Sequence, residues 1–174
     1  QAHGMRFEVI VMQDAEDIVH PLSLKLFNFL VPRFDLVQTP VISLERPWYD
    51  LTGGHYMDEF AELHSKEIIV REFLAGVVPG AGVGTAYSRR ALDVARTKDG
   101  EVFNTGTLTE DYEFSLRLRD AGLKQIFARV PFSRTVARKH WLTRKEQLVT
   151  IVDYICTREY FPNTFRAAVR QKSR

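Results

Sequence analysis

Acidic residues gather at two points of the sequence, and the first group is Asp14, Glu16 and Asp17. It directly follows Phe7 to Met12, a β-branched and apolar run of strand length. Ligands of open α/β sheets bind at the carboxyl ends of strands, and carboxylates there suit Mg²⁺ or Mn²⁺ carrying phosphates. The alternative is a polar loop that caps the next helix, because Asp is common at helix N-termini. The segment by itself leaves both interpretations open.

The second group is Glu110 and Asp111, in the first turn of a short helix predicted within residues 107–122. Thr107 and Glu110 match the capping-box pattern, and apolar residues then recur at helical spacing. In a first helical turn, free N–H groups and the helix dipole favour ionised carboxylates. An ionised carboxylate there could accept a proton from a hydroxyl group. The alternative is that both acids only complement the helix dipole.

Three alternating glycines, Gly80, Gly82 and Gly84, form a further segment of interest. They match a dinucleotide-binding loop poorly, because the third glycine comes one residue early and no acid follows at the required distance. Backbone without side chains nevertheless lets a ligand approach closely. The segment is therefore a candidate binding surface.

The remaining apolar patterns predict an α/β fold in which strands and helices alternate. Further strands are predicted over residues 37–44 and 126–127, and helices over residues 21–30, 55–74, 89–95, 143–155 and 164–174. His55 and His64 on the long helix have no partner at metal-ligand spacing and are interpreted as surface residues. The apolar stripe expected to pack this helix consists of Tyr56, Phe60, Leu63, Val70 and Leu74.

Composition indicates one domain, because 174 residues with 45% hydrophobic content can bury one core but not two full ones. The net charge is only +2, yet residues 134–174 carry ten Lys or Arg against three acids. This basic quarter suggests an anionic neighbour: a phosphate-bearing substrate, a membrane surface or another part of the protein. Cys156 is the only cysteine, which fits a reducing compartment, and no apolar run approaches the length that spans a bilayer.

The order of three short motifs carries a resemblance to a known family. Asp14-Ala15-Glu16-Asp17, Thr109-Glu110-Asp111 and Gln171-Lys172-Ser173-Arg174 resemble motifs of the family 2 glycosyltransferases of the membrane-bound, processive, cellulose-synthase-like type. The sequence is similar in particular to the glycosyltransferase domain of the phage-adsorption protein B group, over nearly the whole chain. In this sequence Glu16 replaces the second aspartate of Asp-x-Asp, which leaves open whether Glu16 or Asp17 meets the metal. The sequence also ends at Arg174, before the tryptophan that closes the third motif.

The resemblance implies a GT-A-like fold, a mixed α/β sheet flanked by helices, of which this chain would be only the acceptor-side portion. Residues 1–142 would form the acceptor and metal side, and residues 143–174 basic, amphipathic helices at a membrane interface. A uridine-binding half is expected to precede this portion in a longer protein. Residues 1–174 alone are therefore expected to bind nucleotide sugar poorly.

The resemblance also implies the chemistry, which is inverting hexosyl transfer from a nucleotide-diphospho-sugar, such as a UDP-sugar, to a growing polysaccharide. A divalent metal, Mg²⁺ or Mn²⁺, would be held by Asp14 and by Glu16 or Asp17. Asp111 would act as the base, and Glu110 would help to fix the site. The residues implied in substrate or acceptor binding are Gly80, Gly82, Gly84, Thr109, Gln171 and Arg174.

The partners implied are the nucleotide-sugar donor, the polysaccharide acceptor, the inner-membrane surface, transmembrane helices of the same full-length chain and an outer-membrane partner. No nucleic-acid partner is expected. The implied location is the cytoplasmic face of a bacterial inner membrane, within an exopolysaccharide synthase. Two alternatives stay open. One is a metal-dependent phosphohydrolase or nuclease, which also gathers acids at strand ends, and the other is a non-catalytic binding module of a membrane assembly.

Overall fold

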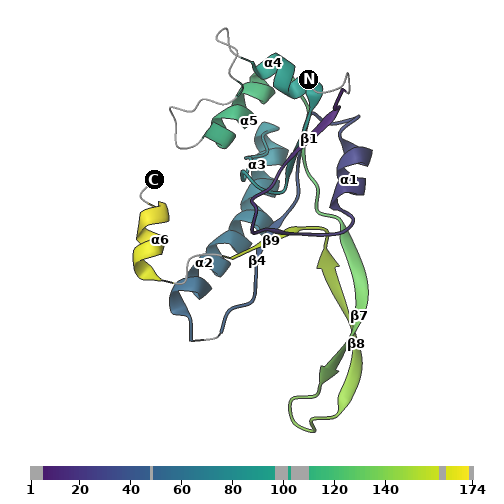
Figure 1. Ribbon diagram of the computed structural model, residues 1–174, viewed down its shortest axis with the longest axis vertical. Helices are drawn as coiled ribbons and strands as arrows, with labels where there is room; N and C mark the ends of the chain where they lie inside the picture. Colours follow the sequence, from purple (N-terminus) through teal and green to yellow (C-terminus); the bar gives the residue numbers. More distant parts are fainter. Residues whose placement is uncertain (1–5, 48, 97–101, 103–109, 161–163, 173–174) are drawn as a thin grey trace.

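The computed structural model describes residues 6–47, 49–96, 102, 110–160 and 164–172. Within these ranges the chain forms mixed sheets flanked by helices (Figure 1), which confirms the α/β prediction and is consistent with a GT-A-like domain fragment. None of the helices in these ranges is long and apolar enough to cross a bilayer.

The central sheet has four strands in the order β1-β5-β3-β6. Their bounds are β1 Val9–Met12, β5 Thr85–Ser88, β3 Leu36–Gln38 and β6 Gln125–Phe127. Strand β5 runs antiparallel to both β1 and β3, whereas β3 and β6 are parallel. Two of these strands match the segments predicted as Phe7 to Met12 and residues 126–127.

Both faces of this sheet are covered, because successive side chains of a strand point to opposite faces. Leu36 and Tyr87 pack on one face in a cluster with Phe114, whereas Val37 and Ala86 pack on the other. The helices that line the first cluster are α3 (Ile68–Ala75), α4 (Arg89–Ala95) and α5 (Glu110–Asp120). Helix α1 (Ser23–Leu30) covers the second face through Phe27. The carboxyl end of β1 and the start of α5 are thereby held by one core.

The strand predicted over residues 37–44 is two strands in two sheets. Strand β3 ends at Gln38, and β4 (Val41–Ser43) belongs to a three-stranded sheet in the order β2-β9-β4, with β2 Ile18–Val19 and β9 Thr157–Glu159. Pro40 lies in the break, where it has no N–H to donate to a ladder. The small sheet matters for the site because β2 follows the acidic loop and β9 pairs with it.

The prediction of a helix over residues 143–155 is wrong. Strands β7 (Pro131–Lys139) and β8 (Glu146–Tyr154) form a two-stranded antiparallel hairpin that extends away from the body (Figure 1). The residues of β8 fit a helical period, but all four residues from Val149 to Val152 are β-branched and favour a strand once a partner is present. The domain boundary predicted at residue 143 falls in the turn of this hairpin and stays a prediction. The helices expected over residues 143–174 are wrong up to Glu159, where the structure has β8 and β9, and α6 (Phe165–Lys172) is the helix found among the described residues after them.

The long helix predicted over residues 55–74 is confirmed, but it begins earlier and contains a π-helical turn. It consists of α2 (Leu51–Glu62), the π turn η1 (Leu63–Glu67) and α3. A π turn accommodates an extra residue, which rotates the apolar stripe after it. Ile68 is therefore buried, whereas Val70 and Leu74 of the predicted stripe are exposed.

The interpretation of His64 as a surface residue is wrong, because it follows Tyr56 and Phe60 in helical steps of four on the buried face. Its side chain is only 4% exposed and stacks against Phe60, with ring centroids 5.6 Å apart. His64 is therefore an interior residue, whereas His55 is on the surface as expected.

Candidate functional site

The loop after β1 is a compact turn that holds the first acidic group. The backbone N–H of Asp17 donates to the Asp14 carbonyl over 3.2 Å, and the Asp14 N–H donates to Asp17 Oδ2 over 2.9 Å. Asp17 Oδ1 is buried and has no hydrogen-bond partner within the described part of the chain. Burial, reinforced by the charges of Asp14 and Glu16, raises the pKa of the Asp17 carboxyl. The turn thus concentrates negative charge that nothing described nearby compensates.

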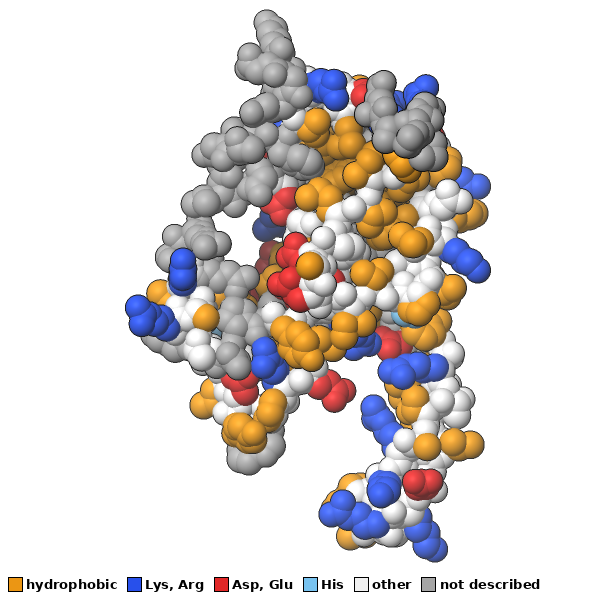
Figure 2. Space-filling model, viewed as in Figure 1, with side chains coloured by type: hydrophobic (Ala, Val, Ile, Leu, Met, Phe, Trp, Pro, Cys, Tyr) orange, Lys and Arg blue, Asp and Glu red, His pale blue; other side chains and the backbone are white. Residues whose placement is uncertain are grey.

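A fourth carboxylate, that of Glu159 on β9, faces this loop. Burial and the charges of Asp17, Asp14 and Glu16, in that order, raise the pKa of Glu159 to about 7. The pairing of β2 with β9 explains the proximity, because Ile18 just after the acidic loop lies opposite Arg158 just before Glu159. Sequence reasoning missed Glu159, since no local pattern connects it to a loop so distant in the chain. Figure 2 shows acidic side chains gathered near the middle of the molecule.

Gln13 ties the acidic loop to the glycine segment. Its Oε1 atom accepts the N–H of Gly84 over 3.1 Å, and its Nε2 atom donates to Thr157 Oγ1 over 3.2 Å. The sheet register has the same effect, because Met12 at the end of β1 lies opposite Thr85. The acidic loop therefore begins directly beside the end of the glycine segment.

Buried Gln38 fixes the shape of the glycine segment. Its Oε1 atom accepts the N–H of Ala81 over 3.0 Å, and its Nε2 atom donates to the carbonyl of Val83 over 2.9 Å. Gly84 has a φ of +64°, and a Cβ there would lie 2.9 Å from both Thr39 Oγ1 and Thr157 Oγ1. Only glycine meets both the left-handed backbone and this close approach. The segment is thus a rigid backbone surface.

Asp111 lies on the other side of this surface. Helix α5 begins at Glu110, so Asp111 is in its first turn as predicted, and its Oδ1 atom accepts the N–H of Tyr112 over 2.8 Å. Its Oδ2 atom is 3.5 Å from the point that a Cβ on Gly82 would occupy. Ser115, one turn later, accepts the N–H of Gly80 over 3.0 Å and locks the helix to the segment.

Tyr87 adds a hydroxyl group to this side of the site. A Cβ on Gly80 would lie 3.4 Å from the Tyr87 hydroxyl, and burial together with the Asp111 charge raises the pKa of that hydroxyl. The Tyr87 ring packs edge-on against Phe114 of α5, with centroids 5.1 Å apart. Sequence reasoning gave Tyr87 no role, because its nearness to Asp111 depends on packing between β5 and α5.

The two acidic groups therefore flank one glycine segment. Gly84 contacts the acidic loop through Gln13, and Gly82 contacts Asp111, two residues earlier. The mechanism implied by the resemblance requires that both groups face one shared surface, and these contacts join each of them to the same glycine segment. This segment offers a polar ligand its backbone and the carboxylates beside it, whereas the Tyr87 hydroxyl is buried.

The acidic loop has the donor chemistry that Mg²⁺ or Mn²⁺ requires. The orphaned Asp17 Oδ1 and the raised pKa of Glu159 both indicate negative charge that a cation would compensate. Within the described residues no three His, Cys, Asp or Glu side chains are gathered as a complete metal-binding group. Mg²⁺ in nucleotide-using enzymes is bound by only one or two carboxylates together with substrate phosphates. The residues present thus fit a metal site in which substrate phosphates would supply the remaining ligands.

The structure does not describe the side chains of four predicted site residues. Thr109 and Arg174 lie outside the described residues, as does Thr107 of the capping box, and only the helical positions of Glu110 and Gln171 are described. Figure 1 shows α6, which carries Gln171, apart from α5 and the central sheet. The roles assigned to these residues stay predictions.

Comparison with known proteins gives a consistent result. The family model described as "Glycosyl transferase family group 2" matches residues 9–174. The chain is similar to "Bacteriophage adsorption protein B" of Escherichia coli strain K12, with 47% identity over 169 residues that cover 97% of this chain and 23% of that protein. "Bacteriophage N4 adsorption protein B" of Escherichia coli O157:H7 matches with the same identity and coverage. The chain thus spans about a quarter of the length of these curated relatives.

Proposed function

The chain belongs to the glycosyl transferase group 2 family, and on this premise we propose that it forms the acceptor-side part of an inverting glycosyltransferase. The donor is a nucleotide-diphospho-sugar, such as a UDP-sugar, and the acceptor is a growing polysaccharide. The observation that carries the proposal is the position of Asp111 and the acidic loop on either side of one glycine segment.

Asp111 is the base of the proposed reaction. The Tyr112 N–H and the N-terminal end of α5 stabilise its ionised form, which is the form that accepts a proton. Its Oδ2 atom is directed at Gly82, where the absence of a side chain lets an acceptor hydroxyl come within hydrogen-bond distance. As this hydroxyl oxygen attacks the anomeric carbon from the face opposite the leaving diphosphate, its proton passes to Asp111.

Asp14, with Glu16 or Asp17, would hold a divalent cation against the donor diphosphate. When bound, such a cation neutralises charge that develops on the leaving group. Gln13 and the pairing of β2 with β9 keep this loop beside the glycine segment. Glu159 is a neighbour whose charge state responds to occupation of the loop, because the three loop acids raise its pKa.

The family match favours transfer over phosphohydrolysis, and the same glycine surface supports a catalytic rather than a purely scaffolding role. A two-metal phosphohydrolase would instead need ions about 4 Å apart, bridged between Asp14 and Asp111.

We also place this part of the protein against the inner surface of a bacterial membrane. The support is the hairpin β7–β8, whose turn combines Trp141 and Leu142, 80% and 68% exposed, with flanking basic residues. Aromatic and apolar residues beside Lys and Arg are typical of bilayer interfaces. An outer-membrane partner and a place within an exopolysaccharide synthase belong to the same proposal.

The decisive experiment compares sugar transfer by the full-length protein carrying Asp111→Asn with the unmodified protein, using a panel of radiolabelled nucleotide sugars. We expect a loss of about 100-fold or more, because general base catalysis contributes about 10²–10⁴-fold. The matched control is Asp120→Asn on the exposed end of the same helix, which should leave transfer unchanged. Full activity of the folded Asp111→Asn protein would refute the assignment.

A further inference from the structure

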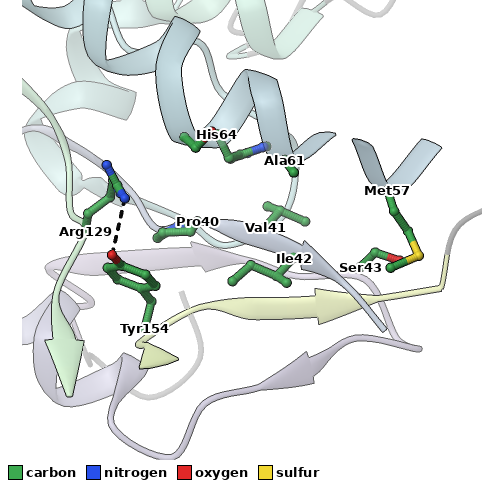
Figure 3. A pocket seen from close by; sticks show the side chains of 10 residues that line it. Pro40, Val41, Ile42, Ser43, Met57, Ala61, His64, Arg129 and Tyr154 are labelled. Atoms are coloured by element: carbon green, nitrogen blue, oxygen red, sulfur yellow. Dashed lines mark hydrogen bonds between the residues drawn. The ribbon is translucent and has the colours of Figure 1, made fainter. Parts of the chain in front are cut away.

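A second pocket, away from the acidic groups, lies between the strand β4 and the helical segment α2–η1. Its volume is about 240 Å³, and Figure 3 shows Met57, Ala61 and His64 on the helical side facing Val41 and Ile42 on the strand side. Pro40 adds to this apolar wall, and Ser43, Ser65, Arg129 and Tyr154 contribute polar groups to the lining. An apolar cavity of about 150 Å³ is already large enough to bind benzene, so this pocket has room for a small ring system.

One polar atom in the pocket wall is unsatisfied. His64 Nδ1 lies 3.3 Å from the carbonyl oxygen of Phe60, and because a carbonyl oxygen can only accept, Nδ1 carries the proton. His64 Nε2 is then an acceptor, and it is buried without a hydrogen-bond partner within the described residues. Burial also lowers the pKa of His64 to about 4, so the ring is neutral at physiological pH. What is missing is an N–H or O–H donor.

His64 occupies this wall because of helical spacing, since it follows Tyr56 and Phe60 in steps of four residues on the buried face of the helix. It lies within the π turn η1, and turns of this kind occur frequently at functional sites. The His64 ring packs between Phe60 and Phe127 at centroid distances of 5.6 and 6.0 Å. A buried acceptor without a donor costs stability, which a bound donor would restore.

Arg129 closes one end of the pocket. Its Nη2 atom donates to the Tyr154 hydroxyl over 3.3 Å, and its guanidinium lies 5.1 Å from the centre of the Tyr154 ring (Figure 3). A guanidinium held in this way can also stack on a ligand ring. A rigid ring loses less conformational entropy on binding than a chain of equal size. Both effects favour an aromatic occupant.

We infer that this pocket binds an aromatic ring that carries one N–H or O–H donor, an indole or a phenol, with the donor directed at His64 Nε2. The ring enters between β4 and α2, and Arg129 covers its end. The inference does not depend on sugar transfer, since none of these residues borders the glycine segment. The same chemistry is available from a free aromatic metabolite or from a tryptophan or tyrosine side chain of another polypeptide segment.

The test uses two isosteric probes, indole and benzothiophene, which differ in that only indole has an N–H. Calorimetric titration of the chain should show saturable indole binding, about tenfold tighter than benzothiophene, as one hydrogen bond to a buried acceptor predicts. A third probe, N-acetyltryptophanamide, then distinguishes a free aromatic metabolite from a polypeptide side chain as the natural occupant. Binding as tight as that of indole indicates a polypeptide side chain, and much weaker binding indicates a free small molecule.

Two variants make the result specific. His64→Phe keeps a ring but removes the acceptor, so the preference for indole over benzothiophene should fall to about one. Ala61→Phe fills the exposed mouth without touching His64 and should weaken both probes, with circular dichroism confirming the fold of each variant. The inference is overturned if the folded chain shows no saturable indole binding. It is also overturned if the two probes bind equally well to the unmodified chain, or if Ala61→Phe leaves both affinities unchanged.

Discussion

The carboxylate of Asp111 lies against the backbone of Gly82. Its Oδ2 atom is 3.5 Å from the point where a Cβ on Gly82 would stand, and Gly82 has a φ of +75°. A methyl group would thus fit without a clash, but it would occupy the space from which a hydroxyl must approach Asp111. This relationship makes Gly82 a sensitive probe of the site.

Gly82→Ala is therefore expected to lower sugar transfer by the full-length protein at least tenfold. The left-handed backbone should cost about 1 kcal/mol of stability as well. Gly76→Ala is a matched control, because Gly76 has a φ of +62° with nothing within 4 Å of its Cβ position. The two variants should lose similar stability in urea unfolding, while only Gly82→Ala loses transfer. Equal transfer by both would remove Gly82 from the acceptor path.

Glu159 should make the stability of the chain depend on pH. Its pKa is raised from an ordinary value of 4.5 to about 7 in the folded chain. Because the pKa of Glu159 is higher in the folded chain than in the unfolded chain, protonation of this side chain stabilises the fold. This stabilisation is fully present below pH 4.5 and is lost as the pH rises through 7. Because Glu159 is only half-buried, solvent screens its charge and the loss is smaller than the full shift in pKa would give.

The measurement is urea unfolding of the chain and of Glu159→Gln at pH 5 and pH 8. The amide cannot ionise, so the variant should match the unmodified chain at pH 5 and exceed its stability at pH 8. A variant that is less stable at both values would show that Glu159 makes a favourable ionised contact instead.

The acidic loop should attract a divalent cation weakly, even without a donor. Mn²⁺ added to the isotopically labelled chain should broaden the amide signals of residues 14–17 and of Glu159 before those of other regions. Asp14→Asn combined with Asp17→Asn should abolish this selectivity, whereas Asp58→Asn on α2 should not. Broadening centred on any other acidic residues would move the metal site away from the loop.

The turn of the hairpin should bind anionic membranes. Vesicles containing phosphatidylglycerol are expected to co-sediment with the chain, and binding should weaken with salt because it includes electrostatic attraction. Trp141→Ala with Leu142→Ala should reduce the bound fraction several-fold. Phe73→Ala with Leu74→Ala is the control, because these side chains are also exposed but lie on α3. Equal loss from both pairs would indicate general hydrophobic adhesion.

Local patterns in the sequence determined the elements that carry the candidate chemistry. The apolar run of β1, the first turn of α5 and the left-handed glycine at its end, Gly122 with φ of +72°, are decided by neighbouring residues. The order of the acidic motif and the Thr-Glu-Asp motif likewise predicted the family that the comparison confirmed. Such features need only a few residues, and so they can be read without a fold.

Only the tertiary structure decided where strands find partners and which side chains are buried. β8 became a strand because β7 pairs with it, although its residues also fit a helical period. Glu159 joined the acidic loop through the pairing of β9 with β2, and Tyr87 came close to Asp111 through packing between β5 and α5. In each case the controlling interaction joins residues that no local period connects. The sequence alone therefore predicted the candidate reacting groups, whereas the fold brought Glu159 and Tyr87 beside them.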